Sequence, residues 1–285
     1  MELSREFIMH PEFDLHRNRQ LRFCLAIAVG LLLAPAHATA QVGLGLSPMR
    51  LELRLAPGAS YSGTLRLYNE GDLTRARASV LDFHIDDQQV PQFEPSLTEE
   101  AAYSCRSWVT VNPMEAELNL RAALPVRYTL RVPAGAEPRS YYCAVGFTSL
   151  PPATDTGRLG IRTAVRVVAA FYVIVGDPPI EGRLSAISIE NIPASENVRA
   201  VVVLENSGRM FYRPKGTLAV SDPSGALIES HDLTSLPVLP ERKQRFLIPL
   251  QKITAGQPCV LRVRVELGTR EIQEGTAVVQ AASVP

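Results

Sequence analysis

Short runs of alternating apolar and polar residues fill the chain from Gln41 onward, and no long segment has apolar residues at helical spacing. Turn residues such as Ala56-Pro57-Gly58 separate these runs. The pattern predicts seven strands in the first half, at residues 44–55, 61–68, 75–85, 107–111, 125–132, 140–149 and 159–175. The polar, irregular segment 86–104 predicts a loop or an insertion.

A second series of about seven runs follows residue 179. The runs lie at residues 183–192, 198–205, 216–221, 226–232, 243–250, 260–267 and 276–281. Between the two series, the Gly-Asp-Pro-Pro segment at 176–179 interrupts the alternation and reads as a stiff linker. We therefore expect an all-β protein with two tandem immunoglobulin-like β-sandwich domains, one at residues 41–176 and the other at 177–285.

Residues 1–40 have the pattern of a secretory signal peptide. Arg17, Arg19 and Arg22 precede an apolar run at 23–35, and small residues follow at Ala36, Ala38 and Ala40. The run is shorter than the roughly 20 residues that span a bilayer. We expect cleavage after Ala38 or Ala40 and a periplasmic, secreted or cell-surface location. An uncleaved anchor is the alternative, and the true start codon could be Met9.

Composition and cysteine placement narrow the function classes. The mixture of 46% apolar and 20% charged residues, with 29 basic against 29 acidic side chains, is globular and gives no electrostatic reason to expect nucleic-acid binding. Cleavage would leave Cys105, Cys143 and Cys259. Cys105 and Cys143 fall in the same predicted domain and could pair in an oxidising compartment, or all three could be small buried side chains.

The chain lacks the residue patterns that enzymes use. Only His84 and His231 follow the predicted signal peptide, and neither stands at metal-ligand spacing with another histidine or a cysteine. Gly43-Leu44-Gly45 is too short for a dinucleotide fingerprint, and no nucleophile elbow occurs. We expect no enzyme activity, no cofactor, no metal and no small-molecule substrate.

Two stretches resemble periplasmic pilus-assembly chaperones. One is the sequence Leu-Ser-Pro-Met-Arg-Leu-Glu-Leu at 46–53, which precedes Pro57-Gly58 and a strand ending in Leu67-Tyr68-Asn69. The other is the alternating run at 159–175, which contains Phe171-Tyr172. The resemblance implies two immunoglobulin-like domains that bind protein subunits by lending them a strand.

The resemblance also implies a basic pair in the cleft between the domains that grips the terminal carboxylate of a subunit. Arg50 matches the arginine of that pair. The lysine aligns with Ala169 or Ala170, which cannot bind a carboxylate, and Arg166 could substitute for it. Arg50 could equally be an ordinary solvated strand residue.

The run at 159–175 places its apolar residues on one face and Arg162, Arg166 and Tyr172 on the other. The apolar face consists of Leu159, Ile161, Val165, Val167, Phe171 and Val173. This face would contact a client if it is exposed, or pack the core of the first domain if it is buried.

The first hypothesis is therefore a periplasmic chaperone-like protein whose partners are pilin-like subunits and an outer-membrane usher. Its client-binding residues would be Arg50, Leu159, Ile161, Val165, Arg166 and Val167. The second half of the chain looks more like generic sandwich modules of exported bacterial surface proteins. The alternative is accordingly a structural or adhesive surface module that binds a protein or cell-wall partner.

Overall fold

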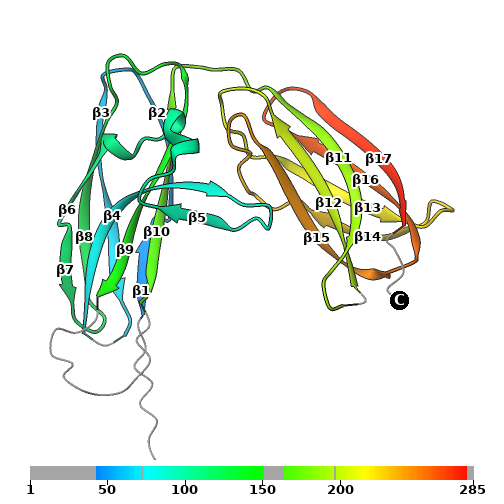
Figure 1. Ribbon diagram of the computed structural model, residues 1–285, viewed down its shortest axis with the longest axis horizontal. Coiled ribbons are helices and arrows are strands. Elements are labelled where there is room, and N and C mark those ends of the chain that lie inside the picture. Colours follow the sequence, from blue (N-terminus) through cyan, green and yellow to red (C-terminus); the bar gives the residue numbers. More distant parts are fainter. Residues whose placement is uncertain (1–42, 72, 151–163, 196, 281–285) are drawn as a thin grey trace, which may run out of the picture. The chain divides into compact units, whose positions relative to one another are not determined.

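The computed structural model describes residues 43–71, 73–150, 164–195 and 197–280 (Figure 1). The predicted signal peptide and its cleavage sites lie outside these residues. So do Leu159, Ile161 and Arg162 of the predicted client-binding run. The described residues form an all-β fold, as the alternating pattern predicts.

The first ten strands form two sheets that face each other. The four-stranded sheet has the order β1-β3-β8-β6, and the six-stranded sheet has the order β2-β10-β9-β4-β5, with β7 also paired to β4. The strands are β1 (Leu44–Ser47), β2 (Arg50–Leu55), β3 (Ser60–Asn69), β4 (Thr74–Ile85), β5 (Pro91–Glu94), β6 (Val109–Asn112), β7 (Glu115–Leu118), β8 (Ala123–Arg131), β9 (Arg139–Leu150) and β10 (Arg166–Val175).

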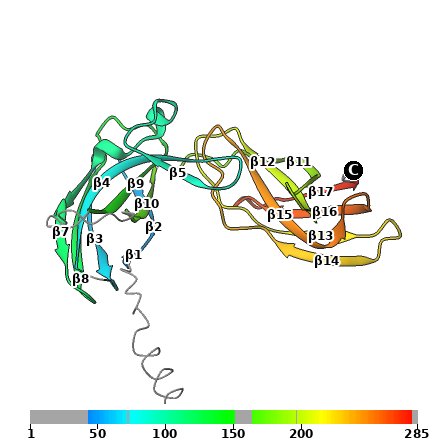
Figure 2. The ribbon, with the colours of Figure 1, turned by 60° about the horizontal axis from the view of Figure 1, so that its bottom comes forward.

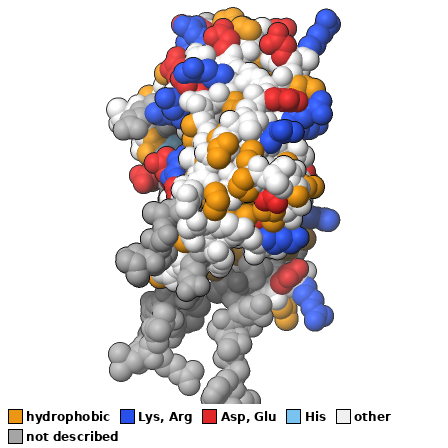
Figure 3. Space-filling model, turned by 90° about the vertical axis from the view of Figure 1, so that its right-hand side faces the viewer, with side chains coloured by type: hydrophobic (Ala, Val, Ile, Leu, Met, Phe, Trp, Pro, Cys, Tyr) orange, Lys and Arg blue, Asp and Glu red, His pale blue; other side chains and the backbone are white. Residues whose placement is uncertain are grey.

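Seven further strands form a second pair of sheets. The three-stranded sheet has the order β11-β12-β15, and the four-stranded sheet has the order β14-β13-β16-β17. The strands are β11 (Gly182–Asn191), β12 (Asn197–Asn206), β13 (Lys215–Ser221), β14 (Leu227–Asp232), β15 (Lys243–Thr254), β16 (Pro258–Glu266) and β17 (Ile272–Gln280). Figure 3 shows one face on which hydrophobic side chains lie among charged ones, as is usual for a protein surface.

The predicted strand at 44–55 is in fact two strands in different sheets. β1 runs antiparallel to β3, whereas β2 runs parallel to β10. Pro48 lies between them, and proline has no backbone N–H to donate to a ladder. The chain therefore changes sheets at Pro48. This change makes Arg50 the first residue of β2, directly opposite Ala170 of β10.

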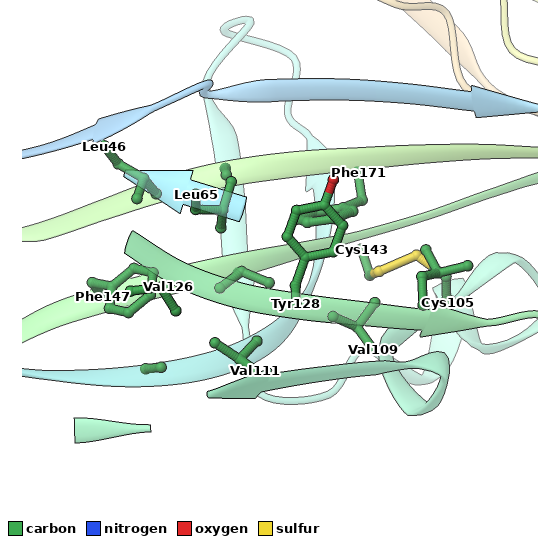
Figure 4. Close-up of a cluster of buried hydrophobic side chains, with 14 of the residues drawn as sticks. Leu46, Leu65, Cys105, Val109, Val111, Val126, Tyr128, Cys143, Phe147 and Phe171 are labelled. Atoms are coloured by element: carbon green, nitrogen blue, oxygen red, sulfur yellow. A yellow bond between two sulfur atoms is a disulfide. The ribbon is translucent and has the colours of Figure 1, made fainter. Parts of the chain in front are cut away.

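The core of the first sandwich consists of the inward side chains of its two sheets. Figure 4 shows Leu65, Val126, Tyr128, Phe147 and Phe171 meeting there, and all of them are almost completely buried. The sulfur atoms of Cys105 and Cys143 are bonded to each other at one end of this cluster, with their Cα atoms 5.2 Å apart. The free Cys259 is buried in the core of the second sandwich.

The segment 86–104, predicted as a loop or an insertion, contains regular structure. β5 pairs with the end of β4, and a 3-10 helix follows, η1 (Thr98–Tyr103). A second 3-10 helix, η2 (Arg106–Trp108), overlaps the start of the strand predicted at 107–111, so that β6 begins at Val109. β7 also has no counterpart in the prediction, and β17 begins earlier than predicted. A strand of four residues is too short for an alternating pattern, so it depends on pairing with a longer neighbour. In Figures 1 and 2 the hairpin of β4 and β5 projects from the first sandwich.

The strands before the segment 176–179 and the strands after it belong to different sheets. Gly176 has a φ of +69°, a backbone conformation that favours glycine. Side chains from both sides of the segment nevertheless share one apolar cluster, in which Tyr172 packs against Phe211 with ring centroids 4.9 Å apart. The division into domains at 176/177 remains a prediction.

Candidate functional site

A cavity of about 440 Å³ lies where β2, β10 and the β4–β5 hairpin meet residues of the second sandwich. Three arginines line it, Arg50, Arg166 and Arg213, and no acidic side chain does. The remaining lining side chains are apolar or aromatic: Met49, Phe83, Ile85, Pro91, Phe93, Val167, Val168, Ala170, Tyr172, Leu236 and Pro237. The cavity therefore combines an apolar surface with excess positive charge, which suits a ligand that is both apolar and anionic.

The two faces of β10 have different surroundings. Val167, Phe171 and Val173 pack into the core of the first sandwich, and the last two are completely buried. On the opposite face, Val168 and Ala170 are half-buried and line the cavity. The apolar face of the predicted run therefore packs its own domain's core from Val167 onward. The opposite face supplies most of the cavity lining on β10, and Val167 of the core-facing side also lines the cavity.

β10 begins one residue later than Val165, which was predicted to lie within the strand. Val165 is half-buried, and its N–H donates to the side-chain oxygen of Ser149 at 2.9 Å. The backbone ladder with β9 starts at the next residue, where Arg166 pairs with Thr148. The carbonyl oxygen of Val165 accepts a backbone hydrogen bond of 2.9 Å from the N–H of Ser149, so a side-chain acceptor replaces only the other bond at this position.

Among the described residues, β10 is paired on both sides from Ala170 onward. Its ladder with β9 covers the whole strand, whereas its ladder with β2 starts at Ala170. Within the part of the chain that the structure describes, no strand pairs with the other edge of residues 166–169. The N–H of Ala170 donates to Met49 across that edge. Since N–H directions alternate along a strand, the N–H of Val168 points to the same, open side.

Arg50 stands at the point where the open edge ends. Its side chain is 54% exposed, and the carboxylate of Glu52 lies 3.6 Å from its Nε, beyond hydrogen-bond distance. The same Glu52 carboxylate accepts a hydrogen bond of 2.7 Å from Nε of Arg213. Glu52 is therefore engaged more closely by Arg213, and among the described residues no hydrogen-bond acceptor takes the donors of the Arg50 guanidinium.

Arg166 lies at the beginning of the open edge. Its Nε donates to Oγ1 of Thr148 at 3.1 Å, and its Nη1 donates to the carbonyl oxygen of Phe93 at 3.5 Å. Both acceptors are uncharged. Among the described residues no carboxylate forms an ion pair with Arg166, so its positive charge remains available to an anion in the cavity.

Arg213 was not predicted as a site residue. Besides Glu52, it donates to the carbonyl oxygen of Ser235 at 3.0 Å, and its guanidinium carbon lies 4.8 Å from the ring centre of Tyr172. Burial raises the pKa of the Tyr172 hydroxyl, and the positive charge of Arg213 offsets only part of this rise. Arg213 lies 161 residues after Glu52 in the sequence, so no local sequence pattern could connect these two residues.

The β4–β5 hairpin, which supplies Phe83 and Phe93, is held at its base by Asp82. This carboxylate is 3% exposed and accepts hydrogen bonds from the hydroxyl of Ser104 at 2.5 Å and from the N–H of Leu97 at 3.2 Å. At the tip, Asp86 accepts bonds from two backbone N–H groups of the turn. These bonds lower the pKa of Asp86 and keep it charged. These hydrogen bonds hold both ends of the hairpin, which forms one wall of the cavity.

The described residues contain no group of three or more histidine, cysteine, aspartate or glutamate side chains that could hold a metal ion. His84 and His231 lie on different strands, and Nε2 of His231 contacts the carboxylate of Glu229 at 2.9 Å. In the described ranges, no helix has the length and apolar character needed to span a membrane.

No protein-family model and no curated protein sequence matches this chain. Among solved structures, it is similar to a chain of a chaperone–tip adhesin complex of CFA/I fimbriae, with 14% identity, a TM-score of 0.44, and coverage of 83% of this chain and 98% of that one.

It is also similar to the Pseudomonas aeruginosa CupB2 chaperone, with 13% identity, a TM-score of 0.39, and coverage of 82% of this chain and 100% of that one. A third similar chain comes from the complex of the Salmonella enterica SafA pilin with the SafB chaperone, with 14% identity, a TM-score of 0.42, and coverage of 85% and 98%. At such low identities and TM-scores these likenesses do not assign a function to the chain.

Proposed function

We propose that this protein is a chaperone-like binder of other polypeptides, which captures an extended segment of its client at the open edge of β10. The observation that supports this is the edge at residues 166–169, on which no described strand lies and which ends at Arg50, whose guanidinium makes only a long ion pair with described residues. An unpaired edge offers backbone donors and acceptors to an incoming strand, and strand addition is a common way to recognise peptides.

The geometry of the edge favours one direction for the incoming strand. β2 occupies the same edge from Ala170 onward, so a client strand on residues 166–169 must stop there. A strand parallel to β10 would stop with its carboxyl end beside Arg50, whereas an antiparallel strand would bring its amino end there. At this end of the open edge, Arg50 attracts a carboxylate and repels an ammonium group. We therefore expect a parallel strand that ends in a free carboxylate.

The side chains that meet the client differ from those of the sequence-based hypothesis. Phe171 and Val173 are buried in the core and are not available. Half-buried Val165 and Val167 remain candidates, together with Arg50 and Arg166. Leu159 and Ile161 remain candidates from the sequence alone. The clients that fit this mode are pilin-like subunits of a surface polymer, with an outer-membrane usher as a further partner and the periplasm as the compartment.

The test is capture of co-expressed pilin-like subunits by the Arg50→Ala variant. Loss of a charge-assisted bond should weaken capture about 10-fold to 150-fold, which corresponds to roughly 1.5–3 kcal/mol. Folding stability should change by less than about 0.5 kcal/mol, because Arg50 is more than half exposed and makes only a long ion pair.

Arg54→Ala is the matched control. Arg54 lies on the same face of β2, is 60% exposed and pairs with Asp177 at 3.3 Å, but does not line the cavity. Capture by this variant should equal that of the parent. Equal capture by the Arg50→Ala variant would refute the proposed anchor and favour a surface module that binds its partner elsewhere.

A further inference from the structure

The apolar part of the cavity is larger than an anchor for a carboxylate requires. Phe83 and Phe93 of the β4–β5 hairpin and Tyr172 of β10 form aromatic walls, with the rings of Phe83 and Phe93 5.5 Å apart and those of Phe83 and Tyr172 5.7 Å apart. Val168 and Ala170 complete the wall on β10. The volume of about 440 Å³ lies within the range of ligand pockets, roughly 300–1,000 Å³.

The cavity lies on the same face of the sheet as the residues that would flank the end of a bound strand. Arg50 is paired with Ala170, and both line the cavity. Side chains of directly paired residues share one face of a sheet. A client residue in register with Val168, at the end of the open edge, would therefore direct its side chain to the cavity, while its carboxylate lies near Arg50.

We propose that this cavity receives the side chain of the client's last residue and selects a bulky apolar one, aromatic or large aliphatic. The proposal rests on the function proposed above and adds which C-terminal residue of the client the protein prefers. Two properties of the site identify a chain terminus as the occupant. The arginines at the rim complement a carboxylate, and the open backbone edge beside them complements an extended peptide.

Burial of the terminal side chain would make the affinity depend on its size. Complete burial of a phenylalanine side chain, compared with glycine at the same position, should increase affinity about 10-fold to 100-fold. The apolar walls of the cavity would cause the preference for a large terminal side chain, whereas the arginines would cause the requirement for a charged terminus. The two effects can therefore be measured separately.

Three N-acetylated pentapeptides test the proposal: Val-Thr-Val-Thr-Phe with a free carboxylate, the same peptide ending in glycine, and the phenylalanine peptide as an amide. Binding to the mature protein is measured by calorimetry. The phenylalanine acid should bind about 10-fold to 100-fold more tightly than the glycine acid. The amide should lose at least about 10-fold relative to the phenylalanine acid, because a neutral terminus forms no charge-assisted bond with arginine.

Ala170→Leu fills the cavity from β10 and should bring the two acids to similar affinity, while the glycine acid still binds. Ala123→Leu is the matched control, because Ala123 is an exposed strand alanine of β8 that does not line the cavity. Phe93→Ala provides a second test in case the larger side chain disturbs β10. It removes part of the aromatic wall and should reduce the preference without affecting the amide effect.

Equal affinity of the parent for the two acids would overturn this inference and leave the carboxylate anchor standing. Failure of both acids to bind would also overturn it, even if subunits are captured. If subunits are not captured either, the proposed function fails as well. A preference that survives in both Ala170→Leu and Phe93→Ala would place the selective pocket elsewhere and overturn the assignment.

Discussion

The open edge of β10 can be tested by proline substitutions at two adjacent residues. The N–H of Val168 points to the open side, where no described strand accepts it, whereas the N–H of Val167 points to β9 in the ladder with Phe147. Proline removes the N–H at either position, and proline is tolerated in sheets only where that N–H is not part of the ladder.

Val168→Pro should therefore leave the fold intact, with a loss of stability below about 1 kcal/mol. Val167→Pro should cost about 2 kcal/mol or more, because it leaves a carbonyl of β9 without its donor and disturbs a side chain that packs on the core. Client capture should nevertheless fall at least about 10-fold in Val168→Pro, because its ring occupies the edge and one donor is lost.

Urea unfolding of both variants measures stability, and pull-down of co-expressed subunits measures capture on the same samples. Capture by Val168→Pro at the level of the parent would show that clients do not use this edge. Destabilisation of Val168→Pro as large as that of Val167→Pro would mean that the edge is already paired within the protein, and the reasoning from the ladder would be wrong.

Three further predictions concern stability and organisation. Removal of the disulfide by Cys105→Ser with Cys143→Ser should lower stability by about 4 kcal/mol, the value for closing a loop of 38 residues, as measured by denaturant unfolding. Burial raises the pKa of Glu229, but bonds from the N–H groups of Gln251 and Lys252 and from His231 outweigh it, so the pKa is lowered. A lowered carboxyl pKa adds stability above the unfolded-state value that is lost as the pH falls. Glu229→Gln should therefore show a shallower decline of melting temperature between about pH 5 and pH 3 than the parent, and an equal decline would contradict the assignment. Limited proteolysis should cut at 176–179 and release two stable fragments, and resistance there would count against two separable domains.

The alternating pattern was sufficient to predict the all-β fold, because alternation depends only on which side chains of one strand turn inward. The resemblance to periplasmic pilus-assembly chaperones singled out Arg50 and Arg166, which the structure places at one cavity. The alternating pattern could not show which face of β10 turns to the core, because every strand of a sandwich alternates. Nor could it show β5 and β7, whose four residues each depend on pairing with β4.

These residues form a site through contacts between segments that are far apart in the sequence. Pro48 marks a break in the first run, but only the tertiary structure shows that β2 joins β10 in parallel and that no described strand lies on one edge of residues 166–169. Arg213 reaches Glu52 across 161 residues, and among the described residues Arg50 keeps only the 3.6 Å contact with the same carboxylate. The sequence by itself determined most of the longer strands and the alternation of apolar and polar side chains along them, because these depend on neighbouring residues. Within the described residues, which edge stays open and which cation keeps only a long ion pair was decided only when distant strands packed together, because pairing and charge neutralisation depend on distances in space.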